Sequence, residues 1–412
     1  MSKEKRRVPK LRFPGFTEDW EQRKLDDIAK IKTGGGTPKT TNLEYWSGDI
    51  PWIQSSDLVE GDVVHVNIKK FINNNALKNS AAKLISRDSI ALVTRVGVGK
   101  VAVINQDFTT SQDFLSLSGF DGNDIKFIAY QLFRLMQENA KVLQGTSIKG
   151  ITKTDLIEQS IAIPNSIKEQ SLIANILSQT DSIITLHQRK LNNLKLKKKA
   201  LLQKLFPKNG ERYPELRFPG FTDAWEQRKL GDIATLSKGN GYSKSDLSAS
   251  GNPIILYGRL YTNYETTIRN VDTFVKLKDK SVISQGGEVI VPASGETAED
   301  ISRASVVKNQ GVIIGGDLNV IKVNILLDPT FLALTISNRE QQKELSKRAQ
   351  GKSVVHLHNS DLQEVNLIFP LLNEQRKIST LFEKMDNIIT LHQRKLDHLQ
   401  LQKKALLQQM FV

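Results

Sequence analysis

The sequence contains no cysteine among its 412 residues. This absence excludes disulfide bonds and every mechanism that uses a thiolate, and it is typical of a reducing compartment, so we expect a cytoplasmic protein. No apolar run approaches the ~20 residues that a membrane span requires. The charged start, MSKEKRRVPK, is not followed by an apolar segment and therefore lacks the pattern of a signal peptide.

Sequence signatures of catalysis are also missing. Gly97-Val98-Gly99-Lys100 and Gly34-Gly35-Gly36-Thr37 lack P-loop spacing, so we interpret these glycines as hairpin and loop residues, which can still bring N–H groups to a DNA phosphate. Asp328-Pro329-Thr330-Phe331 is close to an amino-methyltransferase motif, but threonine replaces the second proline and a helix cap is the better interpretation. With no nuclease cluster, nucleophile triad or zinc signature, we predict no active site, cofactor or metal in this chain.

The charge balance is strongly basic. A net charge of +14 and a pI near 9.6 favour a polyanionic partner, with nucleic acid the first candidate and a membrane surface the second. Hydrophobic and charged contents of 39% and 25% are those of a globular protein. At this length the chain is predicted to fold as two or more domains.

Two blocks of the sequence recur at one offset of 205 residues. LRFPGFTEDWEQRKLDDIA (Leu11–Ala29) returns as LRFPGFTDAWEQRKLGDIA (Leu216–Ala234), identical at 16 of 19 positions, and IITLHQRKL (Ile183–Leu191) returns unchanged at Ile388–Leu396. The stretches between these blocks barely resemble each other. A chain that repeats its frame and varies the rest is organised to hold two different recognition surfaces in equivalent places.

Each repeat is predicted to contain a domain of α/β (α+β) type. In the first repeat, Ser89–Ile104 is rich in β-branched residues and interrupted by glycines, which predicts a hairpin. In the second repeat, Glu288–Ala293 and Ala304–Ile314 form a looser version of the same pattern.

A helix and a shared motif follow in both repeats. The helices are predicted over Ile125–Leu143 and Pro329–Ala349. The motif reads QGTSIKGITKTDL (Gln144–Leu156) in one repeat and QGKSVVHLHNSDL (Gln350–Leu362) in the other, sharing Gln-Gly-x-Ser and a closing Ser/Thr-Asp-Leu. The two domains are therefore predicted to share one fold and to differ at their surfaces.

A long helix is predicted to close each repeat. The first follows Pro164, where Ser166 and Glu169 have capping-box spacing, and it runs to about Phe206. Around 40 residues at 1.5 Å per residue make roughly 60 Å. The stretch PKNGERYP (Pro207–Pro214) then marks the predicted boundary between the repeats.

Each long helix carries an apolar seam with spacings of three and four residues. The two seams are Ile173, Leu177, Thr180, Ile184, His187, Leu191, Leu194, Lys198, Leu201 and Leu205, and Ile378, Phe382, Met385, Ile389, His392, Leu396, Leu399, Lys403, Leu406 and Met410. Such a seam requires a partner helix, and the other copy is the predicted partner. The matching His187 and His392 are either a metal-binding pair or polar residues that fix register; no further ligand stands at helical spacing, which favours register.

Two further segments have side chains suited to DNA. Residues 182–210 contain eight Lys or Arg and no Asp or Glu, which fits a solvated helix face, contact with a DNA backbone or docking to an acidic protein. The loop 33–58 offers Lys39, Tyr45, Trp46 and Trp52, which are suited either to contact with a duplex or to a local core.

The chain resembles a known family, the specificity subunits of type I restriction–modification systems. The resemblance covers essentially the whole length and rests on the duplicated LRFPGFT…W…KLxDIA motif, GGGTP followed by YWSGDIPW, QGTSIKGITKTDL, and two long helices ending LKKKALLQKLF and LQKKALLQQMF. Each motif alone is weak, whereas their repeated order is highly specific.

The resemblance implies two target-recognition domains, each reading one half of a split DNA site. The long helices would pair as an antiparallel coiled coil that sets the gap between the half-sites. It also implies a non-catalytic subunit that assembles with two methyltransferase subunits and with restriction subunits that cleave unmodified DNA. S-adenosylmethionine, used to methylate adenine N6, and ATP and Mg²⁺ are then expected on those partners, with no membrane involved. The expected domains are residues 1–163 and 216–369, with helices 164–206 and 370–412 and a linker 207–215.

Basic residues in predicted loops and hairpin tips are the candidate DNA contacts. They are Lys39, Arg95, Lys100 and Lys149 in the first domain and Lys238, Lys244, Arg259, Arg303 and Lys352 in the second. The long helices and the LRFPGFT blocks are the candidate surface for partner subunits. Two alternatives remain at this point: a methyltransferase or endonuclease acting alone, which the missing motifs disfavour, and a coiled-coil scaffold without DNA specificity.

Overall fold

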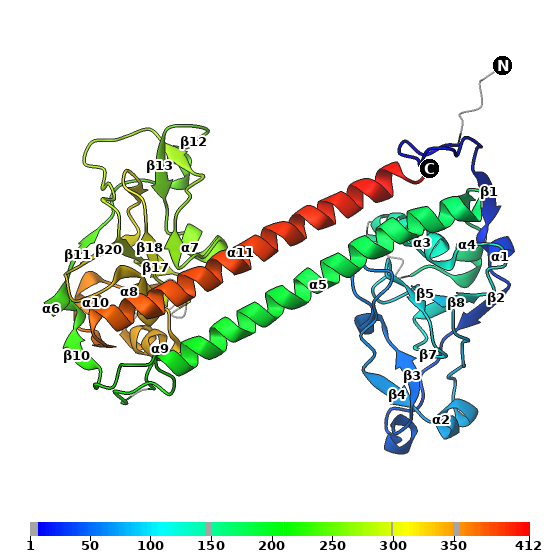
Figure 1. Ribbon diagram of the computed structural model, residues 1–412, viewed down its shortest axis with the longest axis horizontal. Helices are drawn as coiled ribbons and strands as arrows, with labels where there is room; N and C mark the ends of the chain where they lie inside the picture. The colour runs from blue at the N-terminus through cyan, green and yellow to red at the C-terminus, as the bar shows by residue number, and fades with distance from the viewer. Residues whose placement is uncertain (1–6, 145–149, 209, 298–299, 349–354) are drawn as a thin grey trace. The chain divides into compact units, whose positions relative to one another are not determined.

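The computed structural model describes residues 7–144, 150–208, 210–297, 300–348 and 355–412. The chain divides into two compact units, the first formed by Met1–Arg189 with Arg394–Val412 and the second by Lys190–Gln393. Each unit combines one α/β domain with the first part of its own long helix and the last part of the other repeat's long helix (Figure 1). The units therefore cut across the sequential division into domains and helices.

The first unit contains most of the elements of the first repeat. In chain order these are β1 (Glu21–Lys24), α1 (Leu25–Ile28), β2 (Ile31–Gly34), η1 (Leu43–Trp46), β3 (Ile50–Ile53), η2 (Ser55–Asp57), β4 (Lys70–Ile72), α2 (Asn74–Asn79), β5 (Ser89–Val93), β6 (Val101–Ile104), β7 (Thr109–Thr110), β8 (Phe114–Ser118), α3 (Ile125–Gln144), α4 (Lys153–Ile157), β9 (Ser160–Ile163) and the start of α5 (Ile167–Leu205).

The central sheet of the first unit is antiparallel, in the order β2-β8-β5-β6. β5 and β6 form the hairpin predicted over Ser89–Ile104, and those two end residues face each other. Ile90 and Leu92 pack in the core that includes α3 and α5, whereas Ala91 and Val93 pack toward the smaller sheet β4-β3-β7. A strand covered on both faces carries a continuous apolar run, as β5 does.

The second unit repeats this plan with more and shorter strands. Its elements are β10 (Glu226–Lys229), α6 (Leu230–Ile233), β11 (Ala234–Lys238), η3 (Lys244–Asp246), β12 (Leu247–Ser248), β13 (Asn252–Ile255), α7 (Arg259–Thr262), β14 (Thr267–Ile268), β15 (Phe274–Val275), β16 (Glu288–Pro292), β17 (Ser294–Gly295), η4 (Asp300–Ser302), β18 (Ser305–Val307), β19 (Ile313–Ile314), β20 (Leu318–Val323), α8 (Pro329–Ile336), α9 (Arg339–Arg348), β21 (Val355–His356), α10 (Asn359–Gln363), β22 (Asn366–Phe369) and most of α11 (Leu372–Gln409).

The central sheet of the second unit runs β11-β20-β16-β18-β14. β16 and β18 are antiparallel, as the predicted hairpin pattern requires. The end of the predicted segment Ala304–Ile314 differs, because Ile313 and Ile314 leave this sheet as β19 and pair in parallel with β13 in a second sheet, β12-β15-β13-β19. The core again lies between this central sheet and the helices.

The prediction of one helix over Pro329–Ala349 is wrong. The chain forms α8 and α9, separated at Ser337 and Asn338. Asp328 caps α8 as predicted, since its Oδ1 accepts the N–H of Phe331 at 2.9 Å. Ser337 Oγ then accepts the N–H of Ala304 at 3.0 Å, which ties the end of the apolar α8 to the sheet before the polar sequence of α9 begins.

The long helices α5 and α11 span 39 and 38 residues, within a few residues of the predicted bounds. None of the predicted seam residues is exposed. Half of the predicted capping box is present: the N–H of Glu169 donates to Ser166 Oγ at 3.4 Å, but the Glu169 carboxylate binds Arg12 instead. No helix in the described part of the chain is long and apolar enough to cross a membrane.

Within each unit, α5 and α11 run antiparallel to each other. In the first unit, Leu177 of α5 shares a core with Leu407 of α11, and Asp181 pairs with Lys403. In the second unit, Lys198 pairs with Asp386, and residues 205–206 share a core with Ile378 and Phe382. Residue numbers therefore rise along α5 as they fall along α11 in both units.

Candidate nucleic-acid interface

Three motif-bearing segments meet at one edge of the central sheet in the first unit. The glycine-rich turn after β2 lies against the segment before β8, since the N–H of Gly36 donates to Thr110 O at 2.9 Å. The end of β5 joins them: the N–H of Thr94 donates to Asp113 O, and Thr94 O accepts the N–H of Ile151, both at 2.8 Å. The hairpin, the glycine-rich loop and the segment after the Gln-Gly-x-Ser motif thus share one surface.

Glycine is required at two positions of this edge. A Cβ on Gly35 would lie 2.0 Å from Ser111 O, and a Cβ on Gly150 would lie 2.7 Å from Thr94 O. Both neighbours are backbone atoms, so no side-chain rotation could relieve the clash. Gly35, one of the glycines that resemble a phosphate loop in the sequence, therefore serves the packing of these segments.

A surface pocket of about 600 Å³ opens at the same edge. Its charged and amide side chains are Arg95 at the hairpin tip, Gln112 and Asp113 before β8, and Lys153 at the start of α4. Arg95, Gln112 and Lys153 are exposed. Guanidinium, amide and carboxylate groups discriminate base edges by paired hydrogen bonds, so this set of side chains is chemically suited to reading DNA.

The second unit builds the equivalent edge on the same backbone bonding. The N–H of Leu357 donates to Ala293 O at 3.0 Å, matching the bond between the corresponding segments of the first unit. β17 adds a short antiparallel pairing with β21, in which Ser294 lies opposite His356. The carboxyl end of the central strand therefore meets the segment that follows the Gln-Gly-x-Ser motif in both units.

The side chains at this second edge are different. His356 and His358 stack with ring centroids 6.3 Å apart. The exposed Lys238 ends β11, which pairs with β20 in the central sheet. The hydroxyl of Tyr261 donates to Ser294 O at 2.7 Å. One backbone framework thus carries two unlike sets of polar side chains.

The nine predicted basic residues differ in their exposure and in their partners. Lys39, Arg95, Lys238 and Lys244 are exposed, and Arg303 is half-buried. Arg95 and Lys238 lie at the edges described above. Lys149 and Lys352 lie outside the described residues.

Two of the predicted DNA contacts are engaged inside their domains. Lys100 Nζ donates to Ser55 O and Leu58 O at 3.1 and 3.2 Å. The Arg259 guanidinium pairs with Glu265 at 2.9 Å and with Asp272 at 2.8 Å. Because the acceptors of these cations lie between six and 45 residues away in sequence, no local pattern reveals them. Lys100 and Arg259 are therefore held by partners within their own domains.

The aromatic residues of loop 33–58 form a local core. Trp52 is buried and donates its Nε1–H to Gly36 O at 3.1 Å. Trp46 meets it edge-on at 4.9 Å, and Lys70 Nζ lies 5.5 Å from the Trp52 ring centroid. Of the two roles predicted for this loop, core packing is confirmed for Trp52.

The seam histidines lie among no recognisable metal ligands. His187 and His392 are half-buried. Across the described residues, no group of three or more His, Cys, Asp or Glu side chains is placed to hold a metal ion.

A repeated ion pair fastens each LRFPGFT block to a long helix, and sequence reasoning missed it. The Arg12 guanidinium binds both carboxylate oxygens of Glu169 at 2.7 and 2.9 Å, and Arg217 binds Glu374 at 2.9 and 2.9 Å. All four residues obey the 205-residue offset, so the repeat itself was the available signal. Each glutamate is buried, with only 1% of its side chain exposed.

A repeated aromatic cluster completes the same junction. Trp20 packs edge-on against Phe411 at 6.1 Å, and Trp225 packs edge-on against Phe206 at 6.0 Å. Phe206 follows α5 and Phe411 follows α11. The LRFPGFT block of each unit therefore docks on the end of the other repeat's long helix.

Comparison with a family model gives two matches. The model described as "Type I restriction modification DNA specificity domain" matches residues 17–196 and 222–401. The two matched ranges are themselves offset by 205 residues.

Known proteins and structures similar to this chain include specificity subunits. The chain is 28% identical to the MjaIX specificity subunit of Methanocaldococcus jannaschii over 394 residues, covering 90% of this chain and 88% of that protein. It is 31% identical to the EcoR124I/EcoR124II specificity subunit of Escherichia coli over 180 residues, covering 42% and 43%. Its fold matches the crystal structure of a type I S subunit from M. genitalium with a TM-score of 0.65, 17% identity and coverage of 98% and 99%.

Proposed function

The chain belongs to the family of type I restriction–modification DNA specificity subunits, and from this premise we propose that its two α/β domains each read one half of a split DNA site. Specificity subunits are the non-catalytic components of their complexes. The observation that carries the proposal is the duplicated sheet edge, where equivalent backbone bonds hold unlike polar side chains. Equivalent frames with different side chains are what an asymmetric, two-part site requires.

Side chains at the two edges divide into base-reading and phosphate-binding groups. In the first domain, Arg95 and Gln112 line the pocket and are suited to bidentate contacts with guanine and adenine. In the second domain, His356 and Lys238 occupy the corresponding edge. The exposed Lys39, in a loop, and Lys244, at the start of η3, are assigned to phosphates, which set register and salt dependence.

The long helices act as the ruler between the half-sites. With 39 and 38 residues, each helix is about 58 Å long at 1.5 Å per residue. Half-sites one turn of DNA apart are separated by about 34 Å. The antiparallel stretches in each unit support a coiled coil that is long enough to span such a gap.

A repeated apolar surface on the helices supports docking of two copies of one partner. Three pairs of residues at the 205-residue offset remain exposed in both repeats: Ile183 and Ile388, Leu186 and Leu391, and Leu196 and Leu401. Exposed large apolar residues at identical positions indicate an interaction site. We assign it to two methyltransferase subunits.

The catalysed reactions are then carried out by the partner subunits in the cytoplasm. The methyltransferase subunits would bind S-adenosylmethionine and methylate adenine N6 after the base leaves the stack. Restriction subunits would use ATP and Mg²⁺. Residues of this chain choose the site and hold the partners on it.

Co-expression with the partner methyltransferase subunit tests this function. N6-methyladenine is mapped across the host genome by single-molecule sequencing, with each subunit expressed alone as the control. A split, asymmetric motif that appears only with both subunits is expected. Methylation by this chain alone would indicate an enzyme, and a stable complex without methylation would indicate a scaffold; either result contradicts the proposal.

A further inference from the structure

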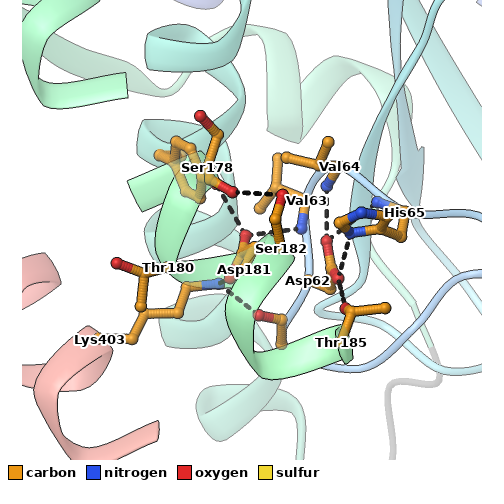
Figure 2. A network of polar contacts seen from close by, with 12 residues as sticks. Asp62, Val63, Val64, His65, Ser178, Thr180, Asp181, Ser182, Thr185 and Lys403 are labelled. Carbon is orange, nitrogen blue, oxygen red and sulfur yellow. Dashed lines mark hydrogen bonds and ion pairs between the residues drawn. The ribbon is translucent and has the colours of Figure 1, made fainter. Parts of the chain in front are cut away.

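A loop of the first domain, Gly61–His65, is fastened to the side of α5 (Figure 2). Asp62 accepts hydrogen bonds from the N–H groups of Val64 and His65 at 2.7 and 3.0 Å, from His65 Nδ1 at 2.8 Å and from the Thr185 hydroxyl at 2.8 Å. Burial raises the pKa of Asp62, but these donors outweigh burial and hold the pKa below its ordinary value. The loop is therefore held on the helix by a charged carboxylate.

The same place joins both long helices to the domain. Asp181 of α5 forms an ion pair with Lys403 of α11 and accepts the hydroxyl of Tyr130 from α3 at 2.7 Å. The N–H of Val63 points to the same carboxylate at 3.4 Å, and Lys403 also donates to Gly61 O. Side chains and backbone from the loop, α3, α5 and α11 thus converge on one buried centre (Figure 2).

The second unit contains the same ion pair in a more exposed setting. Lys198 and Asp386, the counterparts of Lys403 and Asp181 at the 205-residue offset, also pair. Their side chains are 19% and 30% exposed, against 6% and 1% for Lys403 and Asp181. Thr390, the counterpart of Thr185, is exposed. The repeat therefore supplies a matched control for each α5 and α11 residue of this centre.

Contact between domain and helix takes another form in the second unit. Arg269 pairs with Glu383 of α11 at 2.9 Å, with side chains 42% and 24% exposed. An exposed pair of this kind contributes little, whereas removing one partner of a buried pair leaves a charge without water or counter-ion. Both units share some polar contacts between domain and helix, such as the N–H of Asp124 to Gln170 and the N–H of Asp328 to Gln375, both at 2.8 Å. The contacts at Asp62 and at Arg269 are additions that differ between the units.

We propose that Asp62, Asp181 and Lys403 are positioning residues that hold the first recognition domain in one orientation on α5 and α11. The inference rests on the proposed function where it concerns DNA, because the orientation of a reading domain on the ruler fixes the gap at which its half-site is accepted. Lys403 is central, since it is the cation next to Asp181 and also binds the loop backbone. Without it, Asp181 remains buried beside Asp62 with no counter-ion.

Spin-label distances on the isolated full chain test the positioning directly. Because the chain has no cysteine, spin labels attach only to two introduced cysteines. These are Lys83→Cys in the first domain and Arg189→Cys on α5, both at exposed positions. Lys403→Met and Thr185→Val are expected to broaden the distance distribution relative to the otherwise unchanged chain. Lys198→Met and Thr390→Val, the repeat counterparts, should leave it narrow. An unchanged distance distribution in both first-unit variants would overturn the proposal. If Lys403→Met does not fold, Thr185→Val still provides the test, because it removes only one hydrogen bond.

Methylated motifs made by the complex test the consequence for DNA. The unsubstituted chain is expected to direct methylation at a single gap length, whereas Lys403→Met and Thr185→Val also accept gaps one base pair shorter or longer. The control variants should keep the single gap. A single gap in all variants would overturn the role in DNA spacing. Absence of methylation with the unsubstituted chain would instead overturn the proposed function, while the distance measurement still decides the positioning role.

Discussion

At the scale of the residue, two buried glutamates are each matched by an arginine of suitable geometry. Arg12 and Arg217 each hold a buried glutamate with two parallel hydrogen bonds, a geometry that the planar guanidinium provides and lysine does not. The sequence shows that Arg12 and Arg217 are repeated but cannot show their partners, which lie 157 residues further along the chain. Separation in sequence also hid the internal acceptors of Lys100, a predicted DNA contact, because they lie 45 and 42 residues away.

Breaking either pair should destabilise the protein strongly. Arg12→Met and Arg217→Met each leave a buried glutamate without its counter-ion, at an expected cost of about 3–5 kcal/mol in the free energy of unfolding. Chemical denaturation measures this cost in the free energy of unfolding. Arg12→Lys serves as the milder control because it keeps the positive charge but loses the two parallel hydrogen bonds. Costs below about 1 kcal/mol, as for exposed pairs, would contradict this account.

Acid should weaken the loop that Asp62 anchors. Since the pKa of Asp62 is lowered in the folded protein, the unfolded chain takes up its proton first. The stabilisation present at neutral pH therefore begins to be lost at about pH 4, the ordinary pKa of an aspartate, and the loss continues as the pH falls through the lower pKa of the folded state. Among the described residues, the titratable groups that interact with Asp62 include His65, Asp181 and Tyr130. Lys403 pairs with Asp181. Burial raises the pKa of Asp181, which acts in the opposite direction, so the comparison must isolate Asp62.

The Asp62→Asn variant isolates this contribution. The free energy of unfolding is measured by denaturant titration between about pH 6 and 3. The variant is expected to lose stability less steeply than the unsubstituted chain over the acidic part of this range. Parallel slopes would show that Asp62 does not contribute to acid sensitivity.

At the scale of the element, the long helices and the β5–β6 hairpin are predictable because local periodicity determines them. The predicted seams identify the buried faces of α5 and α11 correctly, since none of the seam residues is exposed. The break between α8 and α9 was not predictable, because it depends on the bond of Ser337 Oγ to Ala304, 33 residues away. The position of β19 in a second sheet also depends on a contact distant in sequence, its pairing with β13.

Lengthening both helices should lengthen the DNA gap. Inserting one heptad at equivalent places of α5 and α11 preserves the seam and adds about 10 Å to each helix. The methylated motif should then have a gap longer by about three base pairs, with unchanged half-sites. An insertion of equal size in the linker 207–215 is the control and should leave the gap unaltered. An unchanged gap after the helix insertion would exclude the helices as the ruler.

At the scale of the whole molecule, the chain makes one junction twice. The N–H of Leu11 donates to Gln409 O, and the N–H of Leu216 donates to Lys204 O, both at 2.8 Å. The fixed offset of the repeated blocks predicted the duplicated frame. It could not identify the side chains of each reading edge, because the two domains have diverged there and their polar groups come from segments distant in sequence.

Because the two junctions are equivalent, the chain should tolerate circular permutation. Joining Phe411 to Leu11 with a copy of the natural linker and opening the chain within Pro207–Pro214 keeps both repeated clusters intact. The permuted protein should retain its melting temperature within a few degrees and its methylated motif with partner subunits. Opening the chain inside α5 is the control, which should fail. A permuted protein that folds but directs a different motif would contradict the equivalence of the junctions.

Exchange of one recognition domain tests the central claim most directly. Residues 30–162 are replaced by the corresponding segment of another family member, the chain is co-expressed with its methyltransferase subunit, and N6-methyladenine is mapped across the genome. One half of the motif should change, while the other half and the gap stay as they were. A change in both halves, or in neither, would contradict two separate reading domains on a common frame.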